Sequence, residues 1–385
     1  MRKLTALIIC ACIAVSAAFG KKDRNKAMAD CKQQIRIDSN IIYTYNNRSY
    51  TYLINGEYDS DNTAAQSYLK RGDAAYEKQD TYNAIAFYTE AIRLDPNFVR
   101  AFINRGFTYN IRGDYDKAIA DCNEAIRLAP NNSSAYNNRG TSYYYQGDYD
   151  KAIADFTQAI RLDSNKFEAY NNRGNAYYNK DDYDKAIADY TQAIRLAPAS
   201  ATFYQSRGDA YYQKRDYDKA IADFAQMIRI NPNDEVAYFK RGNAYYDKGD
   251  LDKAIADCTQ AIRINGNYTD AYYYRGNAYA DKGDLDKAIA DYTQAIRINP
   301  NDEDAYFCRG GAYFDKKDYD KAIVDYTQAI RINRNYTDAY YYRGSVYYEK
   351  KDYDKAIADI ETALRLNPND TKIKRALEIA RQRGR

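Results

Sequence analysis

The stretch YRGNAYADKGDLDKAIADYTQAIRINPN, residues 274–301, decides the fold, because it recurs with few changes 34 residues earlier and 34 residues later. If the glycine of each Arg-Gly pair is numbered position 8, the chain contains nine repeats of 34 residues. These repeats run over 65–98, 99–132, 133–166, 167–200, 201–234, 235–268, 269–302, 303–336 and 337–370. A fixed period of this length is typical of proteins built from stacked repeats.

Each repeat carries the pattern of two helices joined by a turn. In the repeat 167–200, Tyr170, Gly174 and Tyr177 follow the spacing of one helical face, and the run YDKAIADYTQAIRL, residues 183–196, carries a second apolar face. Asp occupies position 16 in all nine repeats, where its carboxylate suits a helix N-cap. All six prolines fall at position 32, where proline ends the second helix. One such hairpin cannot bury its apolar face alone, so we expect an all-α solenoid of stacked hairpins.

The composition narrows the classes of function. The 385 residues include 45 Tyr and no His, and 57 basic residues nearly balance 54 acidic residues to give a net charge of +3. The absence of His removes the commonest general base and the commonest metal ligand. The mixed charge lacks the basic stripe expected of a nucleic-acid-binding surface. No Gly-rich phosphate loop is present, and DSDNTA, residues 59–64, lacks the glycine of a calcium loop. We therefore expect no enzyme, no metal, no cofactor and no nucleic acid.

The pattern of the repeats resembles the tetratricopeptide repeat (TPR) family. The resemblance is carried by Gly at position 8, Ala at 20, an aromatic at 24, Ala at 27 and Pro at 32, and it covers 65–370. It departs from the family pattern where Met227 replaces Ala at position 27, and where Ser164, Gly266 and Arg334 replace the proline. The resemblance implies a right-handed superhelix of helix–turn–helix units and a non-enzymatic role in protein–protein interaction.

The two ends of the chain differ from the repeats. Residues 1–20 have a basic start, an apolar run and small residues behind it, which predicts a secretory signal peptide. Residues 21–64 contain fragments that resemble both repeat helices, with 46–59 resembling a first helix, so we interpret them as a degenerate repeat that forms an N-terminal cap. Residues 371–385 predict a C-terminal capping helix. We expect an exported protein, periplasmic or extracellular, with no membrane span after cleavage.

Four cysteines lie outside the expected signal peptide, Cys31, Cys122, Cys258 and Cys308. Their spacing does not suggest a disulfide framework, and Cys122 and Cys258 occupy the same place in repeats that stand four units apart. We expect them to be small buried apolar side chains. Arg at positions 7 and 29 and Asp at 23 are nearly invariant between repeats, which favours a structural role in packing and in ion pairs between neighbouring repeats.

Function is expected where the repeats differ. The resemblance places positions 2, 5, 9, 12 and 13 of the first helix on the concave side of the superhelix. Position 5 is apolar in the first two repeats, an amide in the next three and aromatic in the last four. Position 9 is Asn in three repeats, position 12 is Tyr in six, and position 13 becomes acidic in the second half of the array. The candidate binding residues are Asn137, Asn171, Gln205, Phe239, Tyr273, Phe307 and Tyr341 at position 5, Asn175, Asn243 and Asn277 at position 9, Tyr178, Tyr212 and Tyr246 at position 12, and Asp247, Asp281, Asp315 and Glu349 at position 13.

These residues predict a groove that binds an extended peptide or a partner protein. Amides can donate to and accept from a peptide backbone, and the carboxylates favour a basic ligand. Members of the family that clamp the acidic C-terminal tails of chaperones use Lys at position 5 and Asn at 9, whereas no repeat here has Lys or Arg at position 5, so that partner is excluded. Two alternatives remain, a glycan-binding scaffold of an exopolysaccharide export machinery and a self-assembling structural array. Tyr is also a common core residue in this chain, so the tyrosines that recur on the candidate surface have a purely structural interpretation as well.

Overall fold

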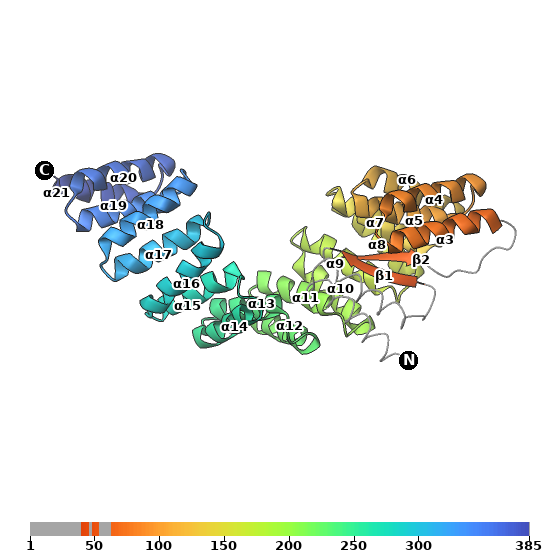
Figure 1. Cartoon of the computed structure of the whole chain (residues 1–385), viewed down its shortest axis with the longest axis horizontal. Coiled ribbons are helices and arrows are strands. Elements are labelled where there is room, and N and C mark those ends of the chain that lie inside the picture. The colour runs from red at the N-terminus through yellow and green to blue at the C-terminus, as the bar shows by residue number, and fades with distance from the viewer. Residues whose placement is uncertain (1–39, 46–47, 54–62, 385) are drawn as a thin grey trace. The chain divides into compact units, whose positions relative to one another are not determined.

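The structure is a computed structural model that describes residues 40–45, 48–53 and 63–384 (Figure 1). Within these ranges the chain forms one β-hairpin followed by nineteen helices. The elements are β1 (Asn40–Tyr45), β2 (Arg48–Leu53), α3 (Thr63–Glu77), α4 (Thr81–Leu94), α5 (Val99–Arg112), α6 (Tyr115–Leu128), α7 (Ser133–Tyr145), α8 (Tyr149–Leu162), α9 (Phe167–Tyr178), α10 (Tyr183–Leu196), α11 (Ala201–Gln213), α12 (Tyr217–Ile230), α13 (Glu235–Lys248), α14 (Leu251–Ile264), α15 (Thr269–Asp281), α16 (Leu285–Ile298), α17 (Glu303–Asp315), α18 (Tyr319–Ile332), α19 (Thr337–Glu349), α20 (Tyr353–Leu366) and α21 (Thr371–Arg383). Each repeat supplies two consecutive helices, and within each of the two units described below consecutive helices pack on each other, so the expected α-solenoid is confirmed.

The turn between the two helices of a repeat has the chemistry that the sequence indicated. In the third repeat the carboxylate of Asp148 accepts a hydrogen bond of 3.2 Å from the backbone N–H of Lys151 at the start of α8. The residue before the Asp is in the left-handed region whether or not it is glycine, for example Gly147 with φ 81° and Lys351 with φ 63°. The fold imposes this conformation, because the tight turn needs a positive φ at position 15.

Position 8 is a point of close approach between the two helices of a repeat. A Cβ atom at Gly276 would lie 2.7 Å from Cε1 of Tyr292, the aromatic residue at position 24. Ala288, at position 20, is fully buried in the same contact region. Small residues at positions 8 and 20 therefore let the large ring at position 24 fill the space between helices.

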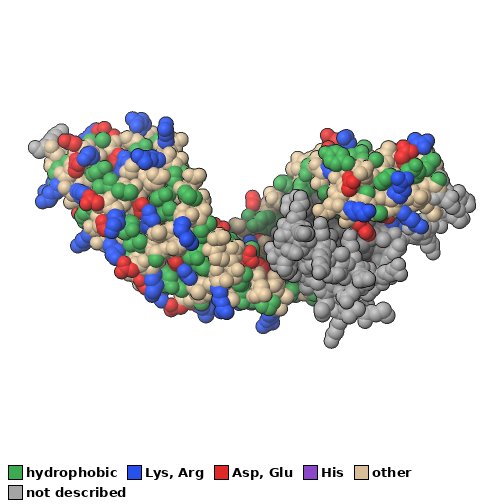
Figure 2. Space-filling view, viewed as in Figure 1, with side chains coloured by type: hydrophobic (Ala, Val, Ile, Leu, Met, Phe, Trp, Pro, Cys, Tyr) green, Lys and Arg blue, Asp and Glu red, His purple; other side chains and the backbone are tan. Residues whose placement is uncertain are grey.

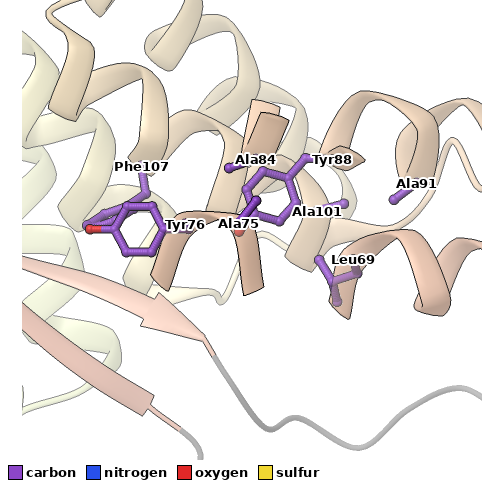
Figure 3. Packing of buried hydrophobic residues seen from close by; sticks show 8 residues of the cluster. All are labelled: Leu69, Ala75, Tyr76, Ala84, Tyr88, Ala91, Ala101 and Phe107. Carbon is purple, nitrogen blue, oxygen red and sulfur yellow. The ribbon is translucent and has the colours of Figure 1, made fainter. Parts of the chain in front are cut away.

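The apolar interior of the first repeat extends into the second. In the first repeat, Leu69, Tyr76 and Tyr88 pack with Ala side chains and with Phe107 of the following repeat (Figure 3). The rings of Tyr76 and Phe107 meet edge to face with their centroids 5.2 Å apart. Each hairpin therefore buries its apolar face against its neighbour, as expected for a solenoid.

Two compact units divide the chain. The N-terminal unit is Met1–Pro232 and the C-terminal unit is Asn233–Arg385. At the end of the C-terminal unit, α21 buries Ile373, Leu377 and Ala380 in a cluster with Ile360 of α20. The expected C-terminal capping helix is thus present. Over the atoms drawn in colour, Figure 2 shows basic and acidic side chains interspersed, which fits the nearly balanced charge.

The N-terminal segment differs from the expectation. β1 and β2 pair in antiparallel register, with Tyr43 opposite Tyr50, so the helix expected over 46–59 is wrong for Arg48–Leu53. The physical reason is composition, since RSYTYL and NIIYTY are rich in the aromatic and β-branched residues that favour strands. The predicted signal peptide of residues 1–20 and the rest of the proposed cap lie outside the described residues. Of the helices that the structure describes, none combines the length and apolarity needed to cross a membrane.

Candidate ligand-binding face

Within each unit, the first helices of successive repeats lie side by side and present a common surface. We call it the first-helix face, and it consists of positions 2, 5, 6, 9, 12 and 13 together with position 34 of the preceding repeat. Position 5 of one repeat contacts position 6 of the next. The amide of Asn172 donates a hydrogen bond of 3.1 Å to Oδ1 of Asn137. In the C-terminal unit the ring centroids of Phe239 and Tyr274 are 5.3 Å apart. The candidate binding residues at position 5 are therefore in contact with side chains of the next repeat.

The amide-rich part of this face is covered. Asn137 and Asn171 are both 0% exposed. Strand β2 lies against α5, α7 and α9, the first helices of the second, third and fourth repeats. The central amides thus lie beneath a contact with the chain's own N-terminal segment, whereas Gln205 of the fifth repeat is partly exposed.

The amides at position 9 have a structural contact that the sequence did not reveal. Oδ1 of Asn175 accepts a 2.8 Å hydrogen bond from the hydroxyl of Tyr190, and Oδ1 of Asn277 accepts one of the same length from Tyr292. Both tyrosines are buried core residues at position 24. In the sixth repeat position 24 is Cys258, which offers no hydroxyl to Asn243. At two of the three predicted amides, the side chain therefore orders a core hydroxyl.

The tyrosines at position 12 pack along the surface. The rings of Tyr178 and Tyr212 each pack edge to face on the tyrosine that begins the second helix of the same repeat, with ring centroids 5.3 and 5.6 Å apart. Tyr246 donates a 2.7 Å hydrogen bond to Oδ2 of Asp281 in the next repeat. Burial, and next the hydrogen bond to Asp281, raise the pKa of Tyr246, so this hydroxyl stays protonated and acts as a donor.

The acidic column at position 13 is exposed and lies in the last turn of its helices. Asp281, Asp315 and Glu349 are the final residues of α15, α17 and α19, and Asp247 is the last but one of α13. A carboxylate at a helix C-terminus faces the negative end of the helix dipole, which costs about 0.3–1 kcal/mol. These acids therefore do not stabilise the helices that carry them.

Several residues of the first-helix face were missed by the sequence analysis. The structure adds Tyr274 and Tyr342 at position 6 and Tyr268 and Tyr336 at position 34, all in contact with the predicted Phe239 or Phe307. It also adds Asp304 at position 2, whose Oδ1 accepts a 2.6 Å hydrogen bond from Tyr336. A signal was present in the sequence, because positions 6 and 34, like position 5, differ between repeats and carry Tyr in the seventh and ninth repeats or immediately before them.

The Arg at position 7 and the Asp at position 23 have a structural role, but their ion pair differs from the expected one. Arg275 makes two hydrogen bonds of 2.7 Å to Asp291 of its own repeat, and a third, of 2.9 Å, to Thr259 of the preceding repeat. The ion pair therefore lies within a repeat and the link between repeats is the threonine, whereas we had expected ion pairs between repeats. In the equivalent pair of the fourth repeat, burial raises the pKa of Asp189 against the lowering effect of Arg173.

The described cysteines are free thiols. Cys122 and Cys258 are buried and Cys308 is half-buried, while Cys31 lies outside the described residues. Burial raises the pKa of Cys258 to about 12. Within residues 64–384, whose side chains the structure describes, no cluster of three or more Cys, Asp or Glu side chains is arranged to hold a metal ion.

The comparisons with known proteins agree with this architecture. Family models described as TPR repeat match residues 242–283, 276–317 and 310–351, and models described as tetratricopeptide repeat match 65–98, 98–165, 137–201, 172–235 and 337–370. The chain belongs to the tetratricopeptide repeat family. Proteins of this family bind peptides or other proteins, so the TPR array of this chain is a protein–protein interaction scaffold. Comparison with curated proteins finds no relative.

Solved structures with similar TPR arrays include three that cover different shares of the chain. YrrB, described as a TPR protein with an unusual peptide-binding site, is 25% identical, covers 51% of this chain and 97% of its own, and has a TM-score of 0.44. MamA is 28% identical over 42% of this chain and 94% of its own, with a TM-score of 0.41. The C-terminal part of a TPR repeat-containing protein from Cytophaga hutchinsonii is 22% identical over 71% of this chain and 99% of its own, with a TM-score of 0.48.

Proposed function

We propose that this TPR protein is an exported scaffold that binds a basic, extended segment of a partner protein on the first-helix face of its C-terminal unit. The observation that carries the proposal is strand β2, which lies across three first helices of the N-terminal unit. An extended backbone is therefore compatible with the surface formed by first helices. The C-terminal unit presents the same kind of surface with a different chemistry.

The charge of that surface favours a basic ligand. In the C-terminal unit the face carries carboxylates at position 13 and, in the last three repeats, also at position 2, namely Asp247, Asp281, Asp315, Glu349, Asp270, Asp304 and Asp338. The four arginines at position 7 of this unit do not offset them, because each is paired with the Asp at position 23 of its own repeat, as in the pair Arg309–Asp325. Partly exposed aromatic side chains lie on the same face, and Tyr342 is 38% exposed, so they add contact area at low entropic cost.

The proposal is tested by binding a synthetic peptide of alternating Lys and Ser to the full chain at low and high salt. Replacing the four acids of position 13 by their amides removes four exposed ion pairs of about 0.2–1 kcal/mol each, so affinity at low salt should fall at least about fourfold and its salt dependence should flatten. The variant carries Asp247→Asn, Asp281→Asn, Asp315→Asn and Glu349→Gln.

A charge-matched control separates a local from a global effect. It carries four replacements of Glu by Gln outside the first-helix face, at Glu90, Glu124, Glu361 and Glu378. This control should bind the Lys peptide as the wild type does. Equal weakening of both variants, or no binding of the Lys peptide by the wild type, would refute the proposal, and binding of an oligosaccharide in its place would favour the glycan alternative.

Export is part of the proposal and rests on the sequence of residues 1–20. The mature chain should begin at Phe19 or Lys21, since small-x-small motifs precede these residues. N-terminal sequencing of the protein recovered from the cell envelope or the medium tests this. A mature chain that begins at Met1 would contradict it.

A further inference from the structure

The C-terminal unit repeats itself at two levels. Two kinds of segment alternate near the start of its first helices. One kind is AYFKRG (237–242) or AYFCRG (305–310), and the other is AYYYRG (271–276 and 339–344). The residues before the AYYYRG segments are NYTD in both cases, at 267–270 and 335–338. The array of 34-residue repeats therefore contains a longer period of 68 residues in this unit, which separates Phe239 from Phe307.

The longer period builds the same aromatic group twice. In the first group Phe239 contacts Tyr268 and Tyr274, with ring centroids 5.2 and 5.3 Å away. In the second, Phe307 contacts Tyr336 and Tyr342 at 5.1 and 5.5 Å. We call these groups the aromatic triads. In the repeat between them, position 5 is Tyr273 and position 6 of the next repeat is Cys308, and the hydroxyl oxygen of Tyr273 lies 3.5 Å from the Sγ atom of Cys308. Position 34 is Asp302, so no aromatic triad forms there.

The tyrosine at position 34 is unfavourable for the helix that it precedes. Tyr268 and Tyr336 are the N-cap residues of α15 and α19, and neither makes a side-chain cap hydrogen bond. In the alternate repeats Asp234 and Asp302 occupy the same place and cap α13 and α17 through their carboxylates. Loss of an N-cap side chain costs about 0.5–2 kcal/mol. Helix formation therefore does not account for these tyrosines, whereas the triads do.

Carboxylates lie beside each triad. Burial raises the pKa of Tyr274, and the next largest contributions come from the nearby charges of Asp247 and Asp270. In the second triad Oδ1 of Asp304 accepts a 2.6 Å hydrogen bond from the hydroxyl of Tyr336. Tyr342 is 38% exposed, so this triad offers ring surface to solvent. Aromatic rings flanked by carboxylates attract a cationic side chain by both cation–π and ion-pair interactions.

We propose that the two aromatic triads are matching subsites, two repeats apart, that each take one Lys or Arg side chain of the same extended polypeptide. This inference rests on the proposed function and adds to it the position and spacing of the basic residues in the ligand. Each site alone is weak, since a cation–π contact at an exposed site is worth about 0.5–1 kcal/mol. Two sites engaged by one chain gain in affinity through the effective concentration of the second side chain, and only when the spacing matches.

The test measures binding of the full chain to fluorescent Gly-Ser peptides that carry two Lys residues. The number of residues between the lysines is varied from about three to about twelve, which spans roughly 14 to 45 Å in an extended chain. One spacing should bind at least about tenfold more tightly than a peptide with a single Lys. The variants Phe239→Leu and Tyr342→Leu, one in each triad, should each reduce the best peptide to the affinity of the single-Lys peptide.

Tyr82→Leu is the matched control, because Tyr82 is an aromatic residue that is 72% exposed and lies in α4, a second helix outside the first-helix face. It should keep the spacing optimum, and unchanged circular dichroism of all variants should show that they fold. The inference is overturned if no spacing is preferred or if the triad variants keep the optimum. In that case the proposed function still stands if the four-acid variant weakens binding of the Lys peptides. Absence of binding by every Lys peptide overturns both.

Discussion

Gly276→Ala tests how closely the two helices of a repeat approach. The added Cβ atom would lie 2.7, 2.9 and 3.2 Å from Cε1, Cδ1 and Cζ of Tyr292. Carbon atoms prefer separations of about 3.5–4.0 Å, so the ring has to move. It is held in place, because it is 2% exposed and its hydroxyl donates to Asn277 at 2.8 Å. Overpacking costs about 1–3 kcal/mol, and the better helix propensity of Ala offsets about 1 kcal/mol of it, so we expect a net destabilisation of up to about 2 kcal/mol.

The sixth repeat supplies the matched control. There position 24 is Cys258, and a Cβ atom at Gly242 would lie 3.2 Å from its Sγ atom and 3.3 Å from the carbonyl oxygen of Ala254. These contacts are tight but need a movement of only a few tenths of an ångström. Gly242→Ala should therefore change the free energy of unfolding by less than about 1 kcal/mol, because the propensity gain and the strain are of similar size.

The assay is guanidinium unfolding of the full chain followed by circular dichroism, with amide hydrogen exchange of α15 and α16 to locate the effect. A double-mutant cycle with Tyr292→Cys isolates the contact, since the shortened side chain removes the ring that the Cβ atom would strike. The coupling energy should favour the double variant by at least about 0.5 kcal/mol. The reasoning is refuted if Gly276→Ala is as stable as the wild type and the cycle shows no coupling.

Three further predictions concern single side chains. Asp291→Asn leaves the Arg275 guanidinium in a half-buried site without its charged partner and should lower the free energy of unfolding by about 3–5 kcal/mol. Asp286→Asn, in an exposed ion pair with Lys316, should lower it by less than about 1 kcal/mol. Chemical denaturation checks both, and equal losses would contradict the role of burial. Lys351→Gly should stabilise the chain by up to about 1 kcal/mol, because φ is 63° at this residue and glycine adopts a positive φ without steric cost. A lower denaturation midpoint would contradict the left-handed conformation at this position. Cys258, whose pKa is raised to about 12 by burial, should resist alkylation by iodoacetamide at a pH of about 8 in the folded chain and react after unfolding, because the thiolate is the nucleophile.

The sequence predicted the fold well because the repeat encodes it locally. Asp at position 16 forms the cap, as Asp148 does, and Gly276 and Ala288 lie at the close contact between helices where the register placed them. Such positions act within one hairpin, so their spacing along the chain is sufficient to assign them. The same local reasoning failed for Arg48–Leu53, where similarity to a first helix was outweighed by the strand preference of aromatic and β-branched residues.

The candidate site was predicted only in part, because its contacts run between repeats. Periodicity indicates which side chains share a helical face, and it placed Phe239 and Phe307 on the first-helix face. It does not indicate which side chain of the next helix they meet, since that depends on how the two first helices are offset. For this reason Tyr274 and Tyr342 at position 6 and the tyrosines at position 34 entered only with the structure.

By itself, the sequence determined the 34-residue period, the helical hairpin and the surface on which the repeats differ. Only the tertiary structure decided how that surface is used. Asn137 and Asn171, which share a register with Phe239 and Phe307, are buried in a region where β2 lies against the first helices. β2 and α9 are separated by more than one hundred residues along the chain, and no periodic pattern specifies such a contact. The contact of β2 with α5, α7 and α9 therefore distinguishes these first helices from those of the later repeats, although their sequences share one register.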